Sequence, residues 1–394
     1  MQHRLVPQPL APVTRGIACR VVAAIRSYMA FMTLMDPPVL AVATDDDTPV
    51  ANTSASEGAL LRTAATLTRD LNSHNPRIYW ADLGLSAAIG YAATALAVVT
   101  PPGWLFAAAV TMAILALYRA GSFIHELTHM KSSAVPGFHT GWNLFVGVPL
   151  LVPSFMYEGV HSLHHARTRY GTAEDPEYLP LALMPPVTLA LFVVVAVLAP
   201  LALLLRYGVL APLSLVIRPL RRALIERYSA LSINPAFRRR APEGDFRSYW
   251  NRWEAAASLW AMAVIAGVAT GIIPWQAFVT VIGIMSASTL LNQVRTLVAH
   301  LWANDGRVLT VTEQYLDSVN VPPPALLPAL WAPVGLRYHA LHHLLPGVPY
   351  HALGEAHRRL ATAFPAGSSY HGASYPGLPP LVARLVAGAK ASQN

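Results

Sequence analysis

Two apolar runs near residue 100 are the strongest constraint on the fold of this chain. Residues 83–99 read LGLSAAIGYAATALAVV and residues 104–118 read WLFAAAVTMAILALY, with the break PPG between them. Each run approaches the roughly 20 residues that a helix needs to cross the hydrocarbon core of a bilayer. Backbone polar groups in lipid must be paired within the structure, which favours helices. The pattern therefore predicts a transmembrane helical hairpin whose outer ends lie on one side.

A second pair of apolar runs repeats this arrangement at 255–273 and 276–291, on either side of Pro274. The composition agrees with a membrane protein, because only 12% of the residues are charged and 54% are hydrophobic. Soluble domains have roughly 25% charged residues. We therefore expect an all-α integral membrane protein with two transmembrane helical hairpins, interfacial helices and a cytoplasmic helical cap that carries the histidine motifs described next.

Histidine motifs follow both hairpins. HELTH (125–129) places two imidazoles at i and i+4, on one face of the helix that leaves the first hairpin. HSLHH (161–165) and HALHH (339–343) each place three imidazoles at i, i+3 and i+4, again on one face. His300 lies just beyond the last apolar run. With 15 histidines in 394 residues, chance predicts roughly 0.02 copies of His-x-x-His-His, so two copies require a physical cause.

The histidines of these motifs are the predicted metal ligands and catalytic residues: His125, His129, His161, His164, His165, His300, His339, His342 and His343. One zinc ion takes at most four ligands, so nine imidazoles fit two metal ions with four or five ligands each. Imidazoles without thiolates suit iron that handles O2. Acidic residues that could orient the imidazoles are Glu126, Glu158, Glu174, Asp175, Asp305 and Asp317. The remaining histidines are expected to be structural or on the surface: His3, His74, His139, His351, His357 and His371.

The apolar segment 186–217 lies between the two hairpins and contains Pro200 and Pro212. A single crossing by this segment would put the histidine motifs on opposite faces of the membrane. We therefore expect this segment to start and end on the same face of the membrane, as an interfacial or re-entrant segment. Residues 206–252 hold ten arginines against three acidic residues, and the positive-inside rule makes this side cytoplasmic. The predicted location is the cytoplasmic (inner) membrane, as a multi-pass protein with its histidine boxes on the cytoplasmic face.

The remaining regions add limits. Residues 1–58 include the polar run DDDTPVANTSASEG and are predicted to be a poorly ordered N-terminal extension. Residues 59–365 are then the membrane domain and 366–394 a C-terminal tail. The single cysteine, Cys19, excludes a disulfide framework and four-cysteine metal sites. The net charge of +8 does not indicate nucleic acid, because the arginines cluster beside apolar spans, where membrane lipid accounts for them.

The order HxxxH, HxxHH, HxxHH, interleaved with two membrane hairpins, resembles the integral-membrane fatty acid desaturase superfamily over residues 60–365. The resemblance implies a non-haem diiron centre of two iron ions held by the nine histidines, and a narrow tunnel for an acyl chain. Residues 336–360 look closest to bacterial acyl desaturases. The chain departs from some relatives at Thr296, where they carry an Asn that reaches iron through water; here Asn292 lies one helical turn further back.

The activity that this resemblance implies is O2-dependent desaturation, in which a fatty acyl lipid or acyl thioester gains a cis double bond. O2 is the co-substrate. An external electron donor, ferredoxin-like or similar, is also implied, because the chain has no haem motif, cysteine cluster or GxGxxG. Tryptophans that could line the tunnel are Trp142, Trp250, Trp253, Trp260, Trp302 and Trp331. The residues leave the acyl carrier, the chain length and the double-bond position open.

Three alternatives stay open at this point. The same centre could hydroxylate an acyl chain or an alkane, or oxidise a carotenoid. HELTH also matches the HExxH helix of zinc proteases, with Glu126 as general base and Asp305 as a third ligand. That alternative leaves seven of the nine histidines unexplained. A histidine-rich metal transporter would place its ligands in mid-membrane, whereas these lie at or beyond the ends of the apolar runs.

Overall fold

The computed structural model describes residues 51–393, and every regular element in that range is helical. Pairing of extended backbone is limited there to isolated bridges, such as the one between His300 and Ser318. The first elements are α2 (Ala51–Leu67) and η1 (Arg69–Leu71). Helix α2 thus begins inside the range predicted as a poorly ordered extension, and the rest of that range, 1–50, lies outside the described residues.

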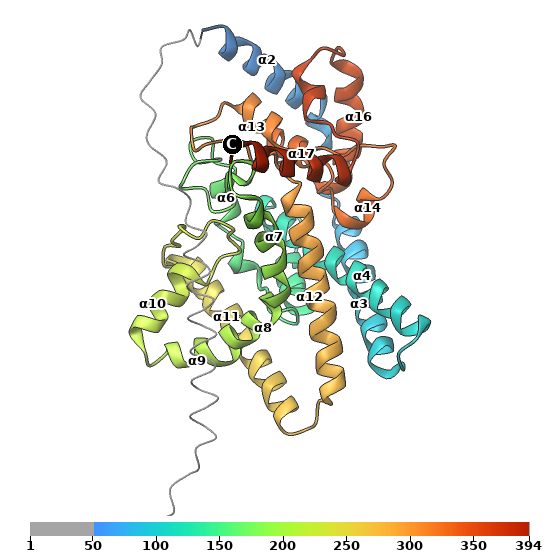
Figure 1. Cartoon of the computed structure of the whole chain (residues 1–394), viewed down its shortest axis with the longest axis vertical. Helices are drawn as coiled ribbons and strands as arrows, with labels where there is room; N and C mark the ends of the chain where they lie inside the picture. The colour runs from blue at the N-terminus through green and yellow to red at the C-terminus, as the bar shows by residue number, and fades with distance from the viewer. Residues whose placement is uncertain (1–50, 394) are drawn as a thin grey trace, which may run out of the picture. The chain divides into compact units, whose positions relative to one another are not determined.

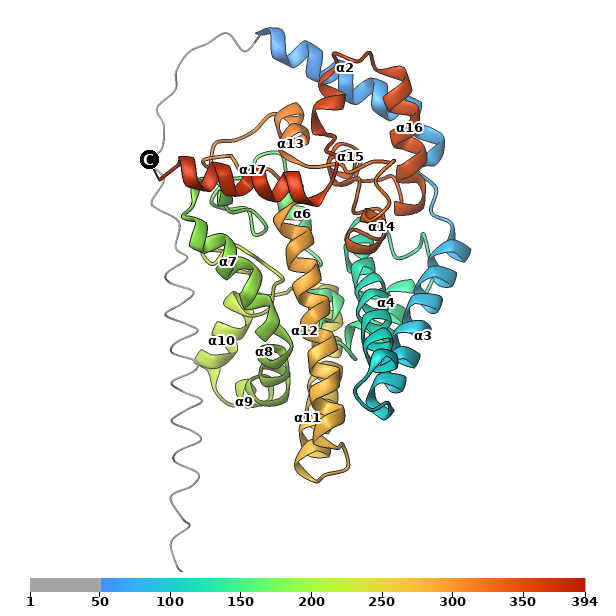
Figure 2. The ribbon, with the colours of Figure 1, turned by 45° about the vertical axis from the view of Figure 1, so that its right-hand side comes forward.

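The first predicted hairpin is formed by α3 (Pro76–Val99) and α4 (Trp104–His129), which lie side by side in both views (Figures 1 and 2). Helix α3 starts at a proline that follows a capping asparagine, since the Asn75 side chain accepts from the backbone N–H of Arg77. Close packing of the pair needs Gly90, because a Cβ there would lie 2.6 Å from a Leu117 methyl. Helix α4 runs past its apolar part and so carries HELTH in its last turns.

The second hairpin consists of α11 (Gly244–Ala269) and α12 (Trp275–Leu297). Four helical segments are long and apolar enough to cross a membrane: Pro76–Val99, Trp104–His129, Pro186–Ser214 and Trp275–Leu297. Together with the helical content, these segments confirm an all-α integral membrane fold. This set differs from the expected spans at two elements, one that is missing from it and one that is added. Helix α11 is absent from it because four charged residues lie between Gly244 and Glu254, and the segment expected to be interfacial is present.

That segment is one continuous helical run whose hydrogen-bond pattern changes near its prolines, as proline requires. Its parts are α7 (Pro186–Val194), η5 (Val195–Leu198), α8 (Ala199–Leu205), η6 (Arg206–Leu210) and α9 (Ala211–Ser214). It packs along α12, where Ser286 Oγ donates to Val197 O at 2.8 Å. After α10 (Arg218–Arg227) the chain returns to its start, and Asn234 Nδ2 donates to Asp175 O at 2.9 Å. Entry and exit therefore lie at the same end of the helices.

Short helices and loops cover the histidine-bearing end. They are α5 (Phe138–Trp142), η2 (Asn143–Gly147), η3 (Ser154–Met156), α6 (His161–His164), η4 (Leu181–Leu183), α13 (Val311–Asp317), α14 (Pro328–Trp331), α15 (His339–Leu344), η7 (Tyr350–Ala352), α16 (Leu353–Ala363), η8 (Ser369–Ala373) and α17 (Leu378–Ala391). The range predicted as a tail thus contains a packed helix. Leu385 and Ala389 of α17 bury against Trp302 and Tyr178, and α17 lies across the end of α7 (Figure 2).

Candidate metal centre

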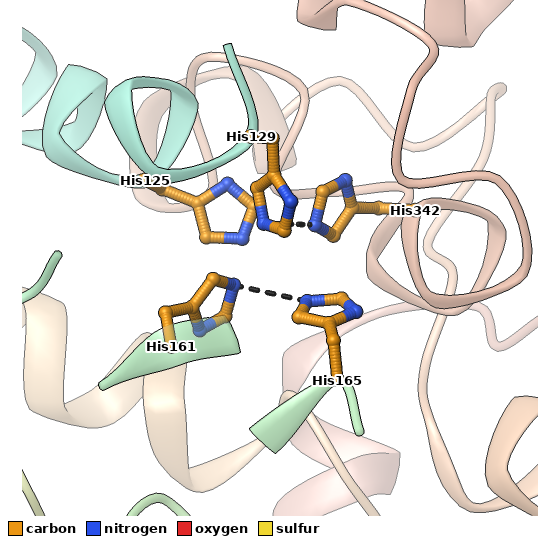
Figure 3. Close-up of side chains that lie close together, drawn as sticks. All are labelled: His125, His129, His161, His165 and His342. Atoms are coloured by element: carbon orange, nitrogen blue, oxygen red, sulfur yellow. Dashed lines mark hydrogen bonds between the residues drawn. The ribbon is translucent and has the colours of Figure 1, made fainter. Parts of the chain in front are cut away.

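The structure brings all nine predicted histidines together in two groups. The first contains His125 and His129 from α4, His161 and His165 at the two ends of the second motif, and His342 from α15. The ligand atoms within each group lie within 4.8 Å of one another. Figure 3 shows the five rings converging from above and below on a common space. His129 Nε2 lies 3.0 Å from His342 Nε2, and His161 Nε2 lies 3.0 Å from His165 Nε2.

The second group contains His164, His300, His339 and His343. Its Nε2 atoms also converge, because His339 Nε2 lies 3.0 Å from His300 Nε2 and 3.2 Å from His343 Nε2. The two groups are adjacent: the stacked rings of His165 and His343, one from each group, have centroids 4.2 Å apart. The two His-x-x-His-His motifs thus contribute to both groups, which explains why a three-histidine pattern occurs twice.

Local structure sets these positions. Helices α4 and α15 hold histidines at i and i+4 on one face. His300 has no helix to hold it, since α12 ends at Leu297. It is fixed by pairing with the strand-like segment that follows α13. Val319 N donates to Ala299 O at 3.0 Å and Leu301 N donates to Asp317 O at 2.7 Å. The position of His300 therefore depends on tertiary contacts.

Carboxylates support the outer nitrogens of three imidazoles, two directly and one through a tyrosine, which is the usual support of a metal-bound histidine. His164 Nδ1 lies 2.9 and 3.1 Å from the Asp175 oxygens, and His161 Nδ1 lies 2.9 Å from Glu177 Oε1. His300 Nδ1 lies 2.8 Å from the Tyr170 hydroxyl, which donates to Asp317 Oδ2 at 2.8 Å. Asp175 is completely buried and also accepts from two backbone N–H groups.

Of the six predicted acidic partners, Asp175 and Asp317 are at the site and the other four are not. Glu126 accepts from the Tyr79 hydroxyl and from Tyr350 N, so it faces away from the histidines. Glu158 accepts from Tyr249, Glu174 pairs with Arg169 at the surface, and Asp305 is exposed. This placement of Glu126 and Asp305 removes the general base and the third ligand that a zinc-protease site needs.

One outer contact of the second group comes from a cationic side chain, whereas the contacts described above come from carboxylates, directly or through a tyrosine. The buried side chain of Arg295, near the end of α12, places Nη2 at 3.2 Å from His339 Nδ1. A guanidinium has only donors, so this geometry makes Nδ1 of His339 the acceptor and leaves the ring proton on Nε2. Glu177, Tyr170 and Arg295 were not predicted. Only Glu177 had a signal, namely its position two residues after Asp175 in the stretch AEDPEY.

Burial keeps most of these imidazoles neutral, because the charged form is poorly solvated. Outside the candidate spans, burial lowers the pKa of six histidines well below their usual value: His161, His165, His300, His339, His342 and His343. Burial also lowers the pKa of His164, but the Asp175 carboxylate raises it by more, so the net pKa is raised. Neutral imidazole is the form that binds a metal ion.

The residues present fit a pair of metal ions. His125 is 6% exposed, yet neither of its ring nitrogens has a hydrogen-bond partner within the described part of the chain. Such a buried orphan needs a ligand, and Figure 3 shows its ring among four others that face the same space. The donor set is entirely imidazole. Four and five imidazoles, backed by carboxylates and without thiolates, fit non-haem diiron binding.

Two of the tryptophans named above as possible tunnel walls, and one pocket, can be located relative to the histidines. Trp302 lies against His300, with ring centroids 4.9 Å apart, whereas Trp260 is 45% exposed to the surroundings of α11. An open pocket of about 500 Å³ adjoins the first group. Its lining is Leu127, Thr128, Met130, Ser132, His139, Thr140, Glu158, Gly159 and Tyr249. Six of these residues lie within three positions of His129 or His161 in the sequence, which indicates that the pocket lies near the first group, although none of the nine histidines is part of the lining.

Comparison with known proteins agrees with this geometry. The family described as "Fatty acid desaturase" matches residues 73–374. A ceramide hydroxylase of Caulobacter vibrioides (strain NA1000 / CB15N) is 53% identical over 325 residues, which cover 82% of this chain and 92% of that protein. No solved structure matches the chain. The family match covers every histidine of both groups, and the chain therefore belongs to the fatty acid desaturase family of membrane oxidoreductases.

Proposed function

We propose that this chain is an O2-dependent diiron oxygenase that hydroxylates a ceramide-type lipid in the membrane. The observation that carries the proposal is the pair of imidazole groups with four and five ligands, found in a chain that is 53% identical to a ceramide hydroxylase. Hydroxylation was an alternative that the sequence left open beside desaturation, and the similarity to a ceramide hydroxylase favours it here.

The nine histidines would hold two iron ions, five at one and four at the other. When bound, such a pair supplies O2 activation strong enough to oxidise an unactivated C–H bond, which no side chain does alone. The protein's own groups orient the ligands. Asp175 and Glu177 hold the rings of His164 and His161, and Tyr170 carries the support of Asp317 to His300.

The overall reaction needs electrons from outside. Hydroxylation combines R–H with O2, two electrons and two protons, and gives R–OH and one water. We propose an external donor, ferredoxin-like or similar, because the described helices hold no second redox group of protein origin. We also propose that the histidine end faces the cytoplasm of the inner membrane, supported by the ten arginines of residues 206–252.

The pocket beside the first group supports a neutral headgroup. Its lining includes the acid Glu158 and several neutral hydrogen-bonding groups but no lysine or arginine. A phosphate or coenzyme A group would meet the Glu158 carboxylate within this lining. Hydroxyl and amide N–H groups, as in a ceramide, could donate to Glu158 and to the hydroxyls of Thr128 and Tyr249.

Desaturation of an acyl chain is the second candidate, and the family description favours it. It would consume the same O2 and electrons but give a double bond and two waters. Lipid extracts from cells with and without the gene distinguish the two by mass, since a hydroxylated ceramide gains one oxygen and a desaturated lipid loses two hydrogens. Unchanged ceramides together with new unsaturated acyl chains would overturn the hydroxylase proposal.

Metal analysis of the purified protein tests the centre itself. We expect about two irons per chain, and the loss of about one of them from a His164→Ala, His342→Ala double variant. One zinc that survives this double substitution would overturn the diiron proposal altogether.

A further inference from the structure

The loop that precedes the third histidine motif has an unusual composition. Residues 322–336 read PPPALLPALWAPVGL and contain no charged side chain and no polar one except the Trp331 indole. The loop leaves and returns at one place, because Val321 N donates to Arg337 O at 2.7 Å and Arg337 Nε donates to Val321 O at 2.8 Å. Helix α14 lies at its tip. The five prolines interrupt regular helix formation, so this loop does not form a membrane-spanning helix.

The tip of this loop exposes leucines. Leu326 is 83% exposed, Leu327 is 70% exposed and Leu330 is 51% exposed. Three neighbouring leucines with such exposure form an apolar patch, and exposed apolar patches mark contact with a partner or a membrane. The buried side of the loop is held by Trp331, which packs against a cluster of buried residues that includes Val298 and Leu381.

The depth of α14 is set by a hydrogen bond to a membrane helix. The Tyr118 hydroxyl of α4 donates to Trp331 O at 2.9 Å. Tyr118 is the last residue of the apolar run of α4, and it lies eleven residues before His129. At 1.5 Å per residue, α14 therefore lies about 16 Å along the helix from His129, toward the membrane. Helix α14 contacts both α4 and α12, which are two of the four candidate spans (Figure 2).

Many backbone polar groups of the loop have partners within the protein, as irregular segments need in the hydrocarbon layer of a membrane. Prolines remove five N–H donors. Ala329 N, Leu330 N and Ala332 N donate within the loop to Leu326 O, Leu327 O and Pro328 O, at 2.9–3.1 Å. Two carbonyls take side-chain donors from outside the tip, Ala325 O from Arg337 and Trp331 O from Tyr118.

We propose that α14 and its leucines are immersed in the acyl-chain layer of the bilayer, as a lipid-facing wall between α4 and α12. Helix α14 contacts two candidate spans, and lipid is the partner that the outer surface of a membrane span already has. The wall lies eight residues before His339, so lipid would contact the segment that leads directly to the metal centre. The proposal does not depend on which lipid is oxidised.

Fluorescence quenching in vesicles tests the proposal. Leu327→Cys in a Cys19→Ser background would carry the only cysteine, labelled with bimane, in the full chain reconstituted into phosphatidylcholine. We expect strong quenching by phosphatidylcholine brominated on its acyl chains and little quenching by iodide in the buffer. Thr362→Cys on α16, which is exposed beyond the apolar runs, is the matched control and should show the opposite pattern.

Leu330→Cys provides a second position on the same patch and should behave like Leu327→Cys. Iron content equal to the parent protein shows that each labelled variant is folded. Quenching of both leucine positions by iodide, without quenching by brominated lipid, would overturn the proposal. Protection from both quenchers would also overturn it, because a second copy of the chain or another protein would then cover the patch.

Discussion

The two histidine groups differ in the support that holds their rings. In the group of four, His164 contacts a buried carboxylate, His300 contacts a tyrosine that leads to Asp317, and His339 contacts Arg295. In the group of five, His161 alone has a carboxylate, shared with the Tyr157 hydroxyl, and His125 has no hydrogen-bond partner among the described residues. Fewer ligands thus coincide with more outer contacts.

This difference indicates that the two metal positions are not equivalent. Five ligands with sparse support can lose one and still leave four imidazoles, the number that the other group has. Four ligands with dense support have no spare, but their rings are already oriented before metal arrives. We therefore expect the group of four to be sensitive to changes in its ligands and in its outer contacts, and the group of five to be tolerant.

The largest expected difference between the two groups is in the iron content of variants that each lack one ligand. His164→Ala leaves three imidazoles in its group, whereas His342→Ala leaves four. We expect His164→Ala to bind about one iron per chain and His342→Ala to retain close to two. Iron content of the purified variants measures this, and equal losses in the two variants would contradict the inequivalence.

Removing one outer carboxylate from each group gives a smaller effect. Asp175→Asn weakens the only contact of His164 Nδ1, so we expect metal affinity at the group of four to fall by about 10–100-fold. Glu177→Gln should cost less, because the Tyr157 hydroxyl also lies 2.9 Å from His161 Nδ1 and can take over. Competition with a chelator measures both, and a larger loss in Glu177→Gln would reverse the ranking.

Acid should destabilise the metal-free protein. The six histidines with lowered pKa values stay neutral when folded, whereas the unfolded chain binds protons below about pH 6.5. Stability is therefore complete above pH 6.5 and falls as the pH drops below it. We expect a lower melting temperature at pH 5.5 than at pH 7.5 in detergent, and a melting temperature independent of pH would contradict the neutral form of these rings.

Arg295→Met should have the smallest effect, and it should be a gain. The guanidinium repels a divalent ion and favours the His339 tautomer that carries its proton on Nε2, the atom that faces the group. Both effects oppose metal binding, so a neutral side chain of similar length should raise affinity at the group of four about threefold. Chelator competition checks the sign, and weaker binding would show that Arg295 supports His339.

Eight of the nine histidines could be proposed from the sequence because their spacing is local, and His300 was proposed from its position beyond the last apolar run. A repeat at i, i+3 and i+4 states which rings share a helix face before any tertiary structure is known. Their division into two groups was not predictable, since neighbours such as His164 and His165 enter different groups. The outer contacts were mostly hidden for the same reason: Tyr170 and His300 are 130 residues apart, and only folding brings them together.

The spans were predictable where apolar runs are uninterrupted, as in α3, α4 and α12. The sequence analysis predicted neither the continuity of the helical run Pro186–Ser214 nor the helix α17. In the first, prolines that suggested breaks are accommodated inside one helical run. In the second, Leu381, Leu385 and Ala389 recur at intervals of four residues, and this short amphipathic signal marks a helix that packs on the core.

Ligands at the ends of membrane helices couple the metal centre to the thickness of the bilayer. Helix α4 carries His125 and His129 in its last turns, and α12 ends three residues before His300. A helix whose apolar length does not match the bilayer tilts to compensate, and a tilt of either helix moves ligands of one group relative to the other. We therefore expect lipid chain length and temperature to change the spacing of the two histidine groups.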